Sequence, residues 1–207
     1  MNLAFRDLYG VENGFQGVEF AGRTDRAILL DGLELHRLPT ADFEVRVGEF
    51  EETYLRHLRT TLAEASGGRV LPGVRELLTA LESTPGTRLG LATGNFRRGA
   101  FMKLEHYQLH HFFPEGGFGG DSEDRSEVVA AAIRRLNSAE PLAPKCVCVV
   151  GDTPIDVEAA RANGARAVGV ATGRSSTTEL SAAGADLVFA DFADWKSALD
   201  ALLSLGD

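Results

Sequence analysis

The sequence predicts an α/β protein in which a subdomain of helices precedes a doubly wound, parallel sheet. Residues 1–68 carry helical patterns only, whereas from residue 69 to 207 short apolar runs alternate with amphipathic stretches. The run from Cys146 to Val150 contains no polar residue, which is typical of a parallel strand covered on both faces. We therefore expect two parts, residues 1–68 and 69–207, with right-handed crossovers in the second.

The first part contains three candidate helices. Met1 to Tyr9 forms a short amphipathic piece, and Thr24 is a suitable N-cap for a helix from Asp25 to about Leu35. Thr40 is the expected N-cap of a long helix, whose apolar residues recur at helical spacing until Ser66, Gly67 and Gly68 stop it.

The second part alternates strand and helix. The expected strands are Arg88–Ala92, Gly116–Gly119, Cys146–Val150, Ala167–Val170 and Asp186–Ala190. The expected helices run from about Val74 to Leu81 and over Arg97–Gln108, Glu127–Leu136, Ile155–Ala162, Thr178–Ala183 and Ala193–Leu203.

Composition excludes several classes of function. The chain of 207 residues is 44% hydrophobic and 25% charged, as expected of a globular protein, and its net charge is -9. Nucleic acids and anionic membranes both demand a basic surface, so neither is an expected partner. No transmembrane stretch or signal peptide is evident, and we expect a cytoplasmic protein. Cys146 and Cys148 are expected to be buried thiols, because they lack zinc-site spacing.

Small polar or acidic residues follow four of the predicted strands. They are Thr93, Gly94 and Asn95 after one strand, Asp121 after the short one, Asp152 after the central one, and Thr172 and Gly173 after the next. Each has a structural alternative, as a helix cap or a turn residue. The carboxyl ends of parallel strands meet at one rim, where ligands bind in sheets of this kind, so their coincidence favours a site.

The segment after the central strand has two interpretations. Thr153 as N-cap, Pro154 at the first helical position and Asp156 form a capping box, which accounts for Asp156 without any chemistry. Asp152 is left unexplained, because an acid between a buried strand and a helix start is costly unless a cation or donor meets it.

These motifs together resemble the haloacid dehalogenase superfamily, whose members are mostly magnesium-dependent phosphatases. Leu89 to Asn95 resembles its second motif, which implies that Thr93, Gly94 and Asn95 hold phosphoryl oxygens. Gly151 to Asp156 resembles the fourth motif, which implies that Asp152 and Asp156 bind or orient Mg²⁺. The resemblance also implies a Rossmann-like core and a small phosphorylated metabolite as substrate, with phosphoglycolate, a sugar phosphate and a nucleotide monophosphate all open.

Two further positions follow from the resemblance. The third motif of the family normally supplies a Lys, and the matching position here holds Arg125, which is a suitable phosphate ligand because it is bidentate and always charged. A solvated loop arginine is the alternative. The helices up to about Ser66 are similar to the cap subdomain of the phosphoglycolate phosphatase-like subgroup, and residues 22–25 resemble its substrate-facing loop. Arg23 is therefore a candidate substrate ligand, although Thr24 as an N-cap explains the same segment.

One motif of the family is absent. Its members begin with an apolar strand ending in Asp-x-Asp-Gly, whose first Asp attacks phosphorus, and this sequence starts inside the cap subdomain. The closest imitation is Ile28-Leu29-Leu30-Asp31-Gly32, in which Leu29 would occupy the position of the nucleophile. Leucine cannot attack phosphate, and the surrounding pattern fits a helix, so we interpret Asp31 as part of the cap structure.

Two explanations of this absence remain open. In the first, the reading frame starts upstream of Met1, so that the functional protein is a phosphatase and the chain as written is inactive alone. In the second, the chain is a non-catalytic phosphate-binding or interaction module, in which the strands ending at Thr93 and Asp152 pair directly with each other.

Overall fold

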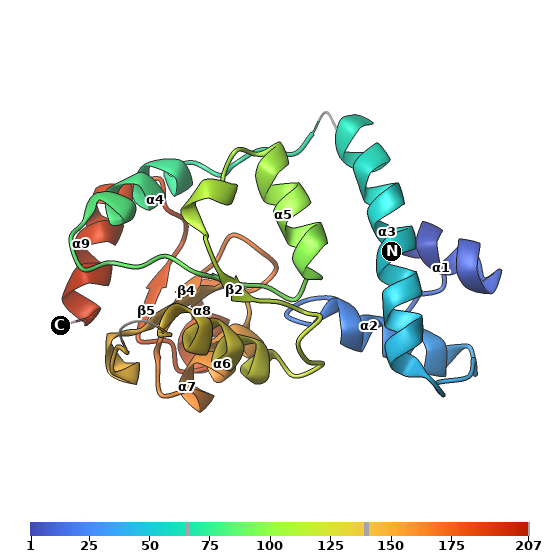
Figure 1. Ribbon diagram of the computed structural model, residues 1–207. Coiled ribbons are helices and arrows are strands. Elements are labelled where there is room, and N and C mark those ends of the chain that lie inside the picture. Colours follow the sequence, from blue (N-terminus) through green and yellow to red (C-terminus); the bar gives the residue numbers. More distant parts are fainter. Residues whose placement is uncertain (65–66, 139–140, 207) are drawn as a thin grey trace.

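The computed structural model describes residues 1–64, 67–138 and 141–206, and it confirms the predicted α/β class. Up to residue 64 the described chain contains helices and connecting loops but no strand. Strands then alternate with helices (Figure 1). The helical part lies to one side of the sheet, with α5 between the two (Figure 1).

The first two helices form as predicted. Helix α1, Asn2–Tyr9, ends at Gly10, which has a φ of 69° and donates its N–H to Arg6 O. Helix α2, Asp25–Leu35, has Thr24 as its N-cap, and the Thr24 side chain accepts from the Ala27 N–H.

The start of the third helix was predicted wrongly. Helix α3, Phe43–Glu64, begins three residues after Thr40, and the Asp42 carbonyl accepts from the N–H groups of Val45 and Arg46. Ser66, the first residue of the expected stop, lies outside the described residues.

The core of the helical part extends into the second part. Phe5, Phe15, Phe50 and Tyr54 form a chain of aromatic contacts, with ring centroids 4.8 to 6.4 Å apart. Phe96, which precedes α5, belongs to the same buried cluster. Burial of this shared apolar surface therefore holds the helical part against α5.

All described strands are parallel. They are β1 (Leu91–Ala92), β2 (Gly116–Gly117), β3 (Cys148–Gly151), β4 (Arg166–Val170) and β5 (Leu187–Phe189). The remaining elements are α4 (Val74–Ser83), α5 (Arg97–His106), α6 (Arg125–Leu136), α7 (Pro154–Ala162), α8 (Thr177–Ala182) and α9 (Trp195–Gly206), and the 3₁₀ turns His110–Phe112 and Pro144–Cys146. Strand β3 starts later than predicted, because Cys146 lies in a 3₁₀ turn.

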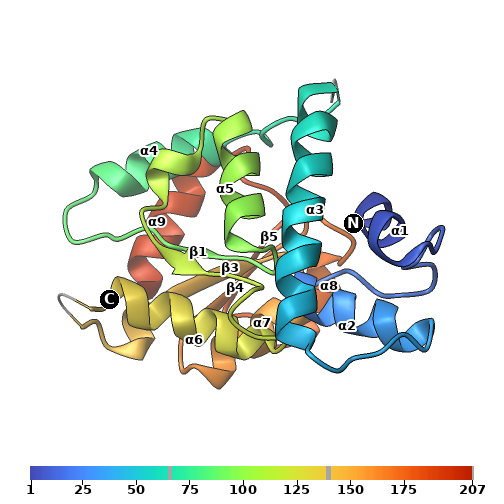
Figure 2. The same cartoon turned by 45° about the vertical axis from the view of Figure 1, so that its right-hand side comes forward.

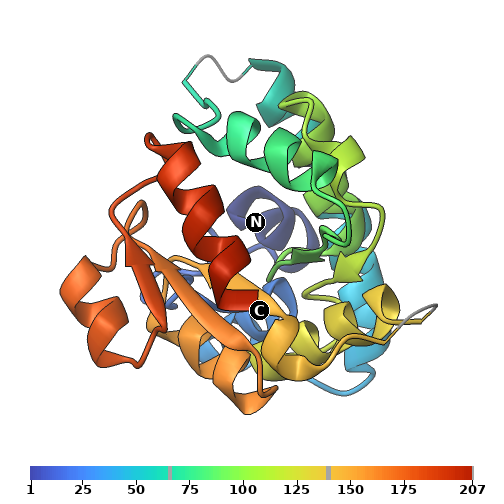
Figure 3. The ribbon, with the colours of Figure 1, turned by 90° about the vertical axis from the view of Figure 1, so that its left-hand side faces the viewer.

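The sheet is covered on both faces. Cys148 and Val168 pack with α4 and α9 on one face. Val149 and Ala167 pack with α7 and α8 on the other. Figures 2 and 3 show α9 and α7 on opposite sides of these strands. This alternation explains why the strands read as continuous apolar runs.

The sheet is interrupted. The described strands form two separate sheets, β1-β2 and β3-β4-β5. The N–H groups of Leu91 and Thr93 bond to the β2 side, so the backbone polar groups of Ala92 face the opposite way. The alternative in which the strands ending at Thr93 and Asp152 pair directly is therefore wrong.

A cavity of about 830 Å³ lies at this interruption. Its lining is mainly apolar and comes from both broken edges and from the covering helices. It includes Leu77, Leu91, Val129, Val149, Val150 and Leu202. Val150 is 45% exposed, although it lies in a strand that the sequence marks as fully buried. The expectation that a first core strand is missing stays a prediction, and this cavity is where such a strand would lie.

Two smaller expectations concern the whole chain. Among the described residues, no helix combines the length and hydrophobicity that a membrane crossing requires. Cys146 and Cys148 are free thiols, but both are only partly buried.

Candidate active site

Arg125 links the end of β1 to helix α7, which follows β3. It is the first residue of α6, whose N-cap is Asp124, so it lies on a helix start and is not the solvated loop residue of the alternative. Its Nη2 donates to Ala92 O at the end of β1, at 3.0 Å, and its Nε donates to Asp156 Oδ1, also at 3.0 Å. The side chain is only 14% exposed. The carboxyl ends of β1 and β3 therefore meet at one rim, as predicted.

Asp156 is fully engaged. It is 5% exposed, and the capping box predicted from sequence is present. One carboxylate oxygen meets Arg125, while the other accepts from Thr153 N at 3.2 Å and from Thr153 Oγ1 at 2.8 Å. Asp156 therefore orients Arg125 and the start of α7, and its prediction as a Mg²⁺ ligand remains a prediction.

Asp152 is the available acid. Among the described residues no other side chain donates to its carboxylate. A Cβ atom at Gly173 would overlap Asp152 Oδ2, so the glycine leaves room for the acid. Burial and the neighbouring charge of Asp156 raise the pKa of Asp152. A half-buried carboxylate in this position is suited to meeting a cation.

The loop of Thr93, Gly94 and Asn95 is held by its own hydrogen bonds. Asn95 N donates to Thr93 Oγ1 at 3.2 Å, and Asn95 O accepts from Gly119 N at 2.8 Å. The Thr93 hydroxyl can still donate its own proton. The Asn95 side chain faces Lys103 and Asp25, so it positions the loop instead of pointing freely at a ligand.

The cap loop, residues 22–25, lies directly on this rim. A Cβ atom at Gly22 would lie 2.8 Å from Thr153 Oγ1, and one at Gly94 would overlap Arg23 O. The Arg23 side chain, however, pairs with Asp31 at 3.0 Å. The structure thus brings Arg23 to the rim through its backbone, and it places Asp31 on helix α2 of the cap.

Gly94 permits this close approach, and we expect Gly94→Ala to separate the cap loop from the core. The added Cβ would overlap backbone atoms of Arg23 and would lie 3.2 Å from Thr24 Cα, and overpacking of this kind costs about 1 to 3 kcal/mol. Urea unfolding monitored by circular dichroism measures the loss of stability. Gly48→Ala is the matched control, because a Cβ there meets open space on a helix and is expected to stabilise by roughly 0.5 to 1 kcal/mol. Equal responses of the two variants would contradict this account.

Two other residues of the predicted rim, Asp121 and Thr172, make local hydrogen bonds. Asp121 accepts from both terminal nitrogens of Arg135, at 2.7 and 2.8 Å, and from Phe118 N. Thr172 follows β4 directly, and its N–H donates to Val170 O. Asp121 is therefore a loop anchor, as its structural alternative stated.

Sequence reasoning missed the contacts of two charged residues beside the loop, the buried Asp25 and the partly buried Lys103. Asp25 is 3% exposed and accepts from Phe96 N at 2.8 Å, and Lys103 Nζ donates to Asn95 Oδ1 at 2.8 Å. The only sequence signal was an acid directly after the N-cap Thr24, which is also ordinary at a helix start.

The donor set fits Mg²⁺ in part. Mg²⁺ is bound by oxygen ligands, with one or two carboxylates from the protein and further oxygens from phosphate or water. Asp152 fits one such carboxylate, whereas both oxygens of Asp156 already have donors. In the part of the chain that the structure describes, no three His, Cys, Asp or Glu side chains converge to hold a metal ion.

Comparison with protein families identifies the family of this chain. A model of the haloacid dehalogenase-like hydrolases matches residues 10–164. The chain belongs to this family. The matched part begins after helix α1 and ends after α7, so it includes Thr93, Arg125 and Asp152.

Individual proteins resemble this chain in sequence or in fold. A phosphoglycolate phosphatase from Mannheimia succiniciproducens is 30% identical over 126 residues, which are 61% of this chain and 55% of that protein. The chain thus spans about half the length of this curated relative. A β-phosphoglucomutase from Clostridium difficile has a TM-score of 0.67 at 19% identity, covering 98% of this chain and 88% of the other. A predicted phosphoglycolate phosphatase from Haemophilus somnus has a TM-score of 0.63 at 22% identity, covering 95% and 87%.

Proposed function

We propose that this protein is a magnesium-dependent hydrolase of small phosphate monoesters, acting through an aspartyl-phosphate intermediate whose nucleophile lies upstream of Met1. A small phosphorylated metabolite is the expected substrate. Support comes from membership of a hydrolase family and from relatives named for phosphoglycolate and phosphoglucose. The ester itself is left open, because Arg23, the cap residue expected to contact it, pairs with Asp31.

The observation that carries the proposal is the unsatisfied Nη1 of Arg125. Nη1 is buried and has no hydrogen-bond partner among the described residues, while Nε and Nη2 are both bonded. A buried cationic donor without an acceptor is costly, and a phosphoryl oxygen at the rim would satisfy it. Arg125 is therefore proposed to bind the transferring phosphoryl group in the role that the family gives to Lys.

The loop after β1 would bind the same group from the other side. Because the Thr93 oxygen already accepts from Asn95 N, the proton of the hydroxyl is available for a phosphoryl oxygen. The Gly94 amide follows directly and carries no side chain to block an anion. Fixed donors of this kind stabilise charge that develops in the transition state.

Asp152 is proposed to hold Mg²⁺ together with groups that the upstream segment supplies. When bound, the ion would neutralise phosphoryl charge. Asp156 would keep Arg125 at the rim through its 3.0 Å bond to Nε. The cap loop would exclude water, since it lies against both Gly94 and Thr153.

The cavity between β1 and β3 is the proposed place of the upstream strand. Its apolar lining and the unpaired edges of β1 and β3 fit an extended apolar segment that runs parallel to both. The carboxyl end of such a strand would emerge at the rim beside Arg125. An aspartate there would face a phosphoryl group held by Thr93 and Arg125.

Binding of inorganic phosphate to the chain tests the proposed cradle. We expect Thr93→Val to weaken phosphate binding and to raise the dissociation constant about 10-fold, because it removes one donor and leaves the Asn95 N–H unpaired. Titration calorimetry provides the measurement. Thr79→Val on α4 is the control, since the Thr79 hydroxyl bonds only to its own helix, at Arg75 O. An unchanged affinity in Thr93→Val would argue against the cradle.

A second candidate function is non-catalytic phosphate binding. It is favoured by the single available carboxylate at the rim, since Asp152 alone among the described acids of this site lacks a side-chain donor. Such a module would bind phosphate through Arg125 and Thr93 and would release none from an ester.

A further inference from the structure

A buried carboxylate of the cap subdomain reaches the phosphate loop of the core. Asp25 is the first residue of α2, and its side chain turns away from its own helix. Its Oδ2 accepts from Phe96 N at 2.8 Å, and its Oδ1 accepts from Asn95 Nδ2 at 3.4 Å. Its backbone N–H donates to Gly94 O at 2.6 Å. One cap residue thus bonds to three consecutive residues that follow β1.

This contact also serves helix α5. The N-cap of α5 is Phe96, whose side chain makes no capping bond, and the first turn of α5 contains no acid. Asp25 supplies the missing negative charge at this helix N-terminus from another subdomain. The loop of residues 93–95 and the start of α5 are therefore fixed by a side chain that the cap provides.

A partly buried lysine completes the arrangement. Lys103 of α5 donates to Asn95 Oδ1 at 2.8 Å, while Asn95 Nδ2 faces Asp25. The Asn95 amide thus bridges a cation and an anion, which fixes the orientation of its oxygen and its NH₂ group. Burial lowers the pKa of Lys103 and raises the pKa of Asp25. Keeping the Asp25 carboxylate buried costs stability, which is a cost typical of functional sites.

We propose that Asp25 is a positioning residue that couples docking of the cap to anion binding at residues 93–95. The inference rests on the proposed function, because it takes the anion to be the phosphoryl group of the substrate. With the cap docked, Asp25 holds the backbone of Gly94 and Phe96 and the side chain of Asn95, so the loop needs no further ordering when phosphate binds. By linkage, phosphate bound at the loop stabilises the docked cap to the same extent.

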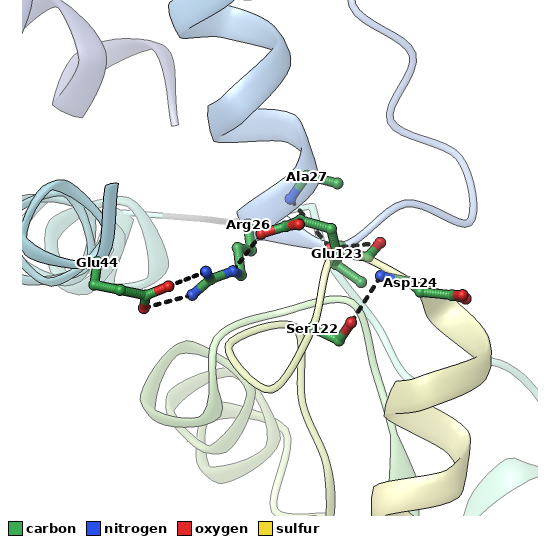
Figure 4. A network of polar contacts seen from close by, with 7 residues as sticks. Arg26, Ala27, Glu44, Ser122, Glu123 and Asp124 are labelled. Carbon is green, nitrogen blue, oxygen red and sulfur yellow. Dashed lines mark hydrogen bonds and ion pairs between the residues drawn. The ribbon is translucent and has the colours of Figure 1, made fainter. Parts of the chain in front are cut away.

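A second cap contact nearby provides a matched control. Arg26 lies between Glu44 of α3 and Glu123 of the core (Figure 4), and its Nε donates to Glu123 at 2.5 Å. This ion pair joins cap and core, but its acids are exposed and it makes no bond to residues 93–96. Arg26→Ala therefore loosens the cap without touching the phosphate loop.

Amide hydrogen exchange of the full chain, measured by NMR, tests the hold of Asp25 on the loop. In Asp25→Ala, the Phe96 amide is expected to exchange about 10- to 100-fold faster, because it loses a charged acceptor. Asp25→Asn keeps the shape of the side chain and one neutral acceptor, so we expect an intermediate exchange rate for the Phe96 amide. This variant provides the test if Asp25→Ala does not fold. Arg26→Ala is expected to leave the Phe96 rate unchanged. Equal Phe96 rates in the wild type and both Asp25 variants would overturn the inference.

Inorganic phosphate tests the coupling itself. Saturating phosphate is expected to slow exchange of the residue 25 amide, which donates to Gly94 O, at least about 3-fold in the wild type and in Arg26→Ala. We expect phosphate to cause no slowing of this exchange in Asp25→Ala and a smaller slowing in Asp25→Asn. A full response in Asp25→Ala, or its loss in Arg26→Ala, would overturn the coupling. If phosphate leaves the exchange rates of the residue 93–95 amides unchanged in the wild type, this loop does not bind phosphate and the proposed function fails here. The Phe96 exchange rates still decide whether Asp25 holds the loop.

Discussion

A chain extended upstream of Met1 by an apolar strand ending in Asp-x-Asp-Gly is expected to hydrolyse para-nitrophenyl phosphate on the order of 10⁴-fold faster than residues 1–207 alone. The reason is chemical. Thr93, Arg125 and Asp152 are proposed to bind a phosphoryl group and a cation, but none of them attacks phosphorus. Hydrolysis of phosphate monoesters is among the slowest uncatalysed reactions, so binding without a nucleophile gives little turnover.

The cavity gives an independent reason to expect such an extension. The residues that line it are mainly apolar, and burying one large apolar side chain is worth roughly 1.5 to 3 kcal/mol. A whole domain is stable by only about 5 to 15 kcal/mol. Even partial filling by an apolar strand is therefore expected to raise the melting temperature of the extended chain strongly, which calorimetry would measure.

The assay separates the two proposed functions. Release of para-nitrophenol is followed for both chains with Mg²⁺ and with a chelator, and a third protein carries Asn in place of the first aspartate of the upstream Asp-x-Asp-Gly. We expect activity only in the extended chain with Mg²⁺ and the intact aspartate. Equal rates for residues 1–207 and the extended chain would refute the upstream nucleophile. Binding of phosphate without turnover by either chain would favour the non-catalytic module.

Arg125→Met is expected to destabilise the protein by about 3 to 5 kcal/mol and to abolish binding of inorganic phosphate. The substitution keeps much of the apolar stem but leaves the Asp156 carboxylate without its charged partner at 5% exposure. It also removes the unsatisfied Nη1 that we propose to meet the phosphoryl group. Urea unfolding and phosphate titration measure the two effects separately.

A double-mutant cycle at Arg125 and Asp156 separates the effect of this pair on stability from its effect on phosphate binding. Asp156→Asn combined with Arg125→Met removes both charges and is expected to recover most of the lost stability, whereas phosphate binding stays absent. Arg125→Lys keeps a cation and is expected to retain part of the binding. Arg98→Met is the control, because the Arg98–Glu52 pair is more than half exposed and is expected to contribute less than about 1 kcal/mol. Phosphate binding that survives in the double variant would refute the role of Arg125.

Local patterns predicted the individual elements well. The capping box of Thr153 and Asp156 and the N-cap Thr24 are present as expected, because these bonds join residues three apart in the chain. The start of α3 was misplaced because Thr40 is followed by a turn in which Asp42 has a φ of 57°, and a positive φ at a non-glycine residue has no reliable local signal.

The site could be predicted only in outline. Strand ends that carry Thr93 and Asp152 follow from apolar runs, and their meeting at one rim follows from the rules of parallel sheets. The partners of Arg125 could not be read from the sequence, because Ala92 and Asp156 lie more than thirty residues away on either side. The same holds for Asp25, which bonds to Phe96 across 71 positions.

The sequence by itself determined the α/β class, the helical start of the chain, the family and the position of most helices and strands, since each rests on short-range periodicity, caps or motifs. Only the tertiary structure decided that β1 and β3 stay apart around an apolar cavity, that Arg125 bonds to both β1 and α7, and that Asp25 of α2 holds the loop of residues 93–95. These are contacts between distant segments, and their energies depend on burial and on which charged groups become neighbours when the chain packs.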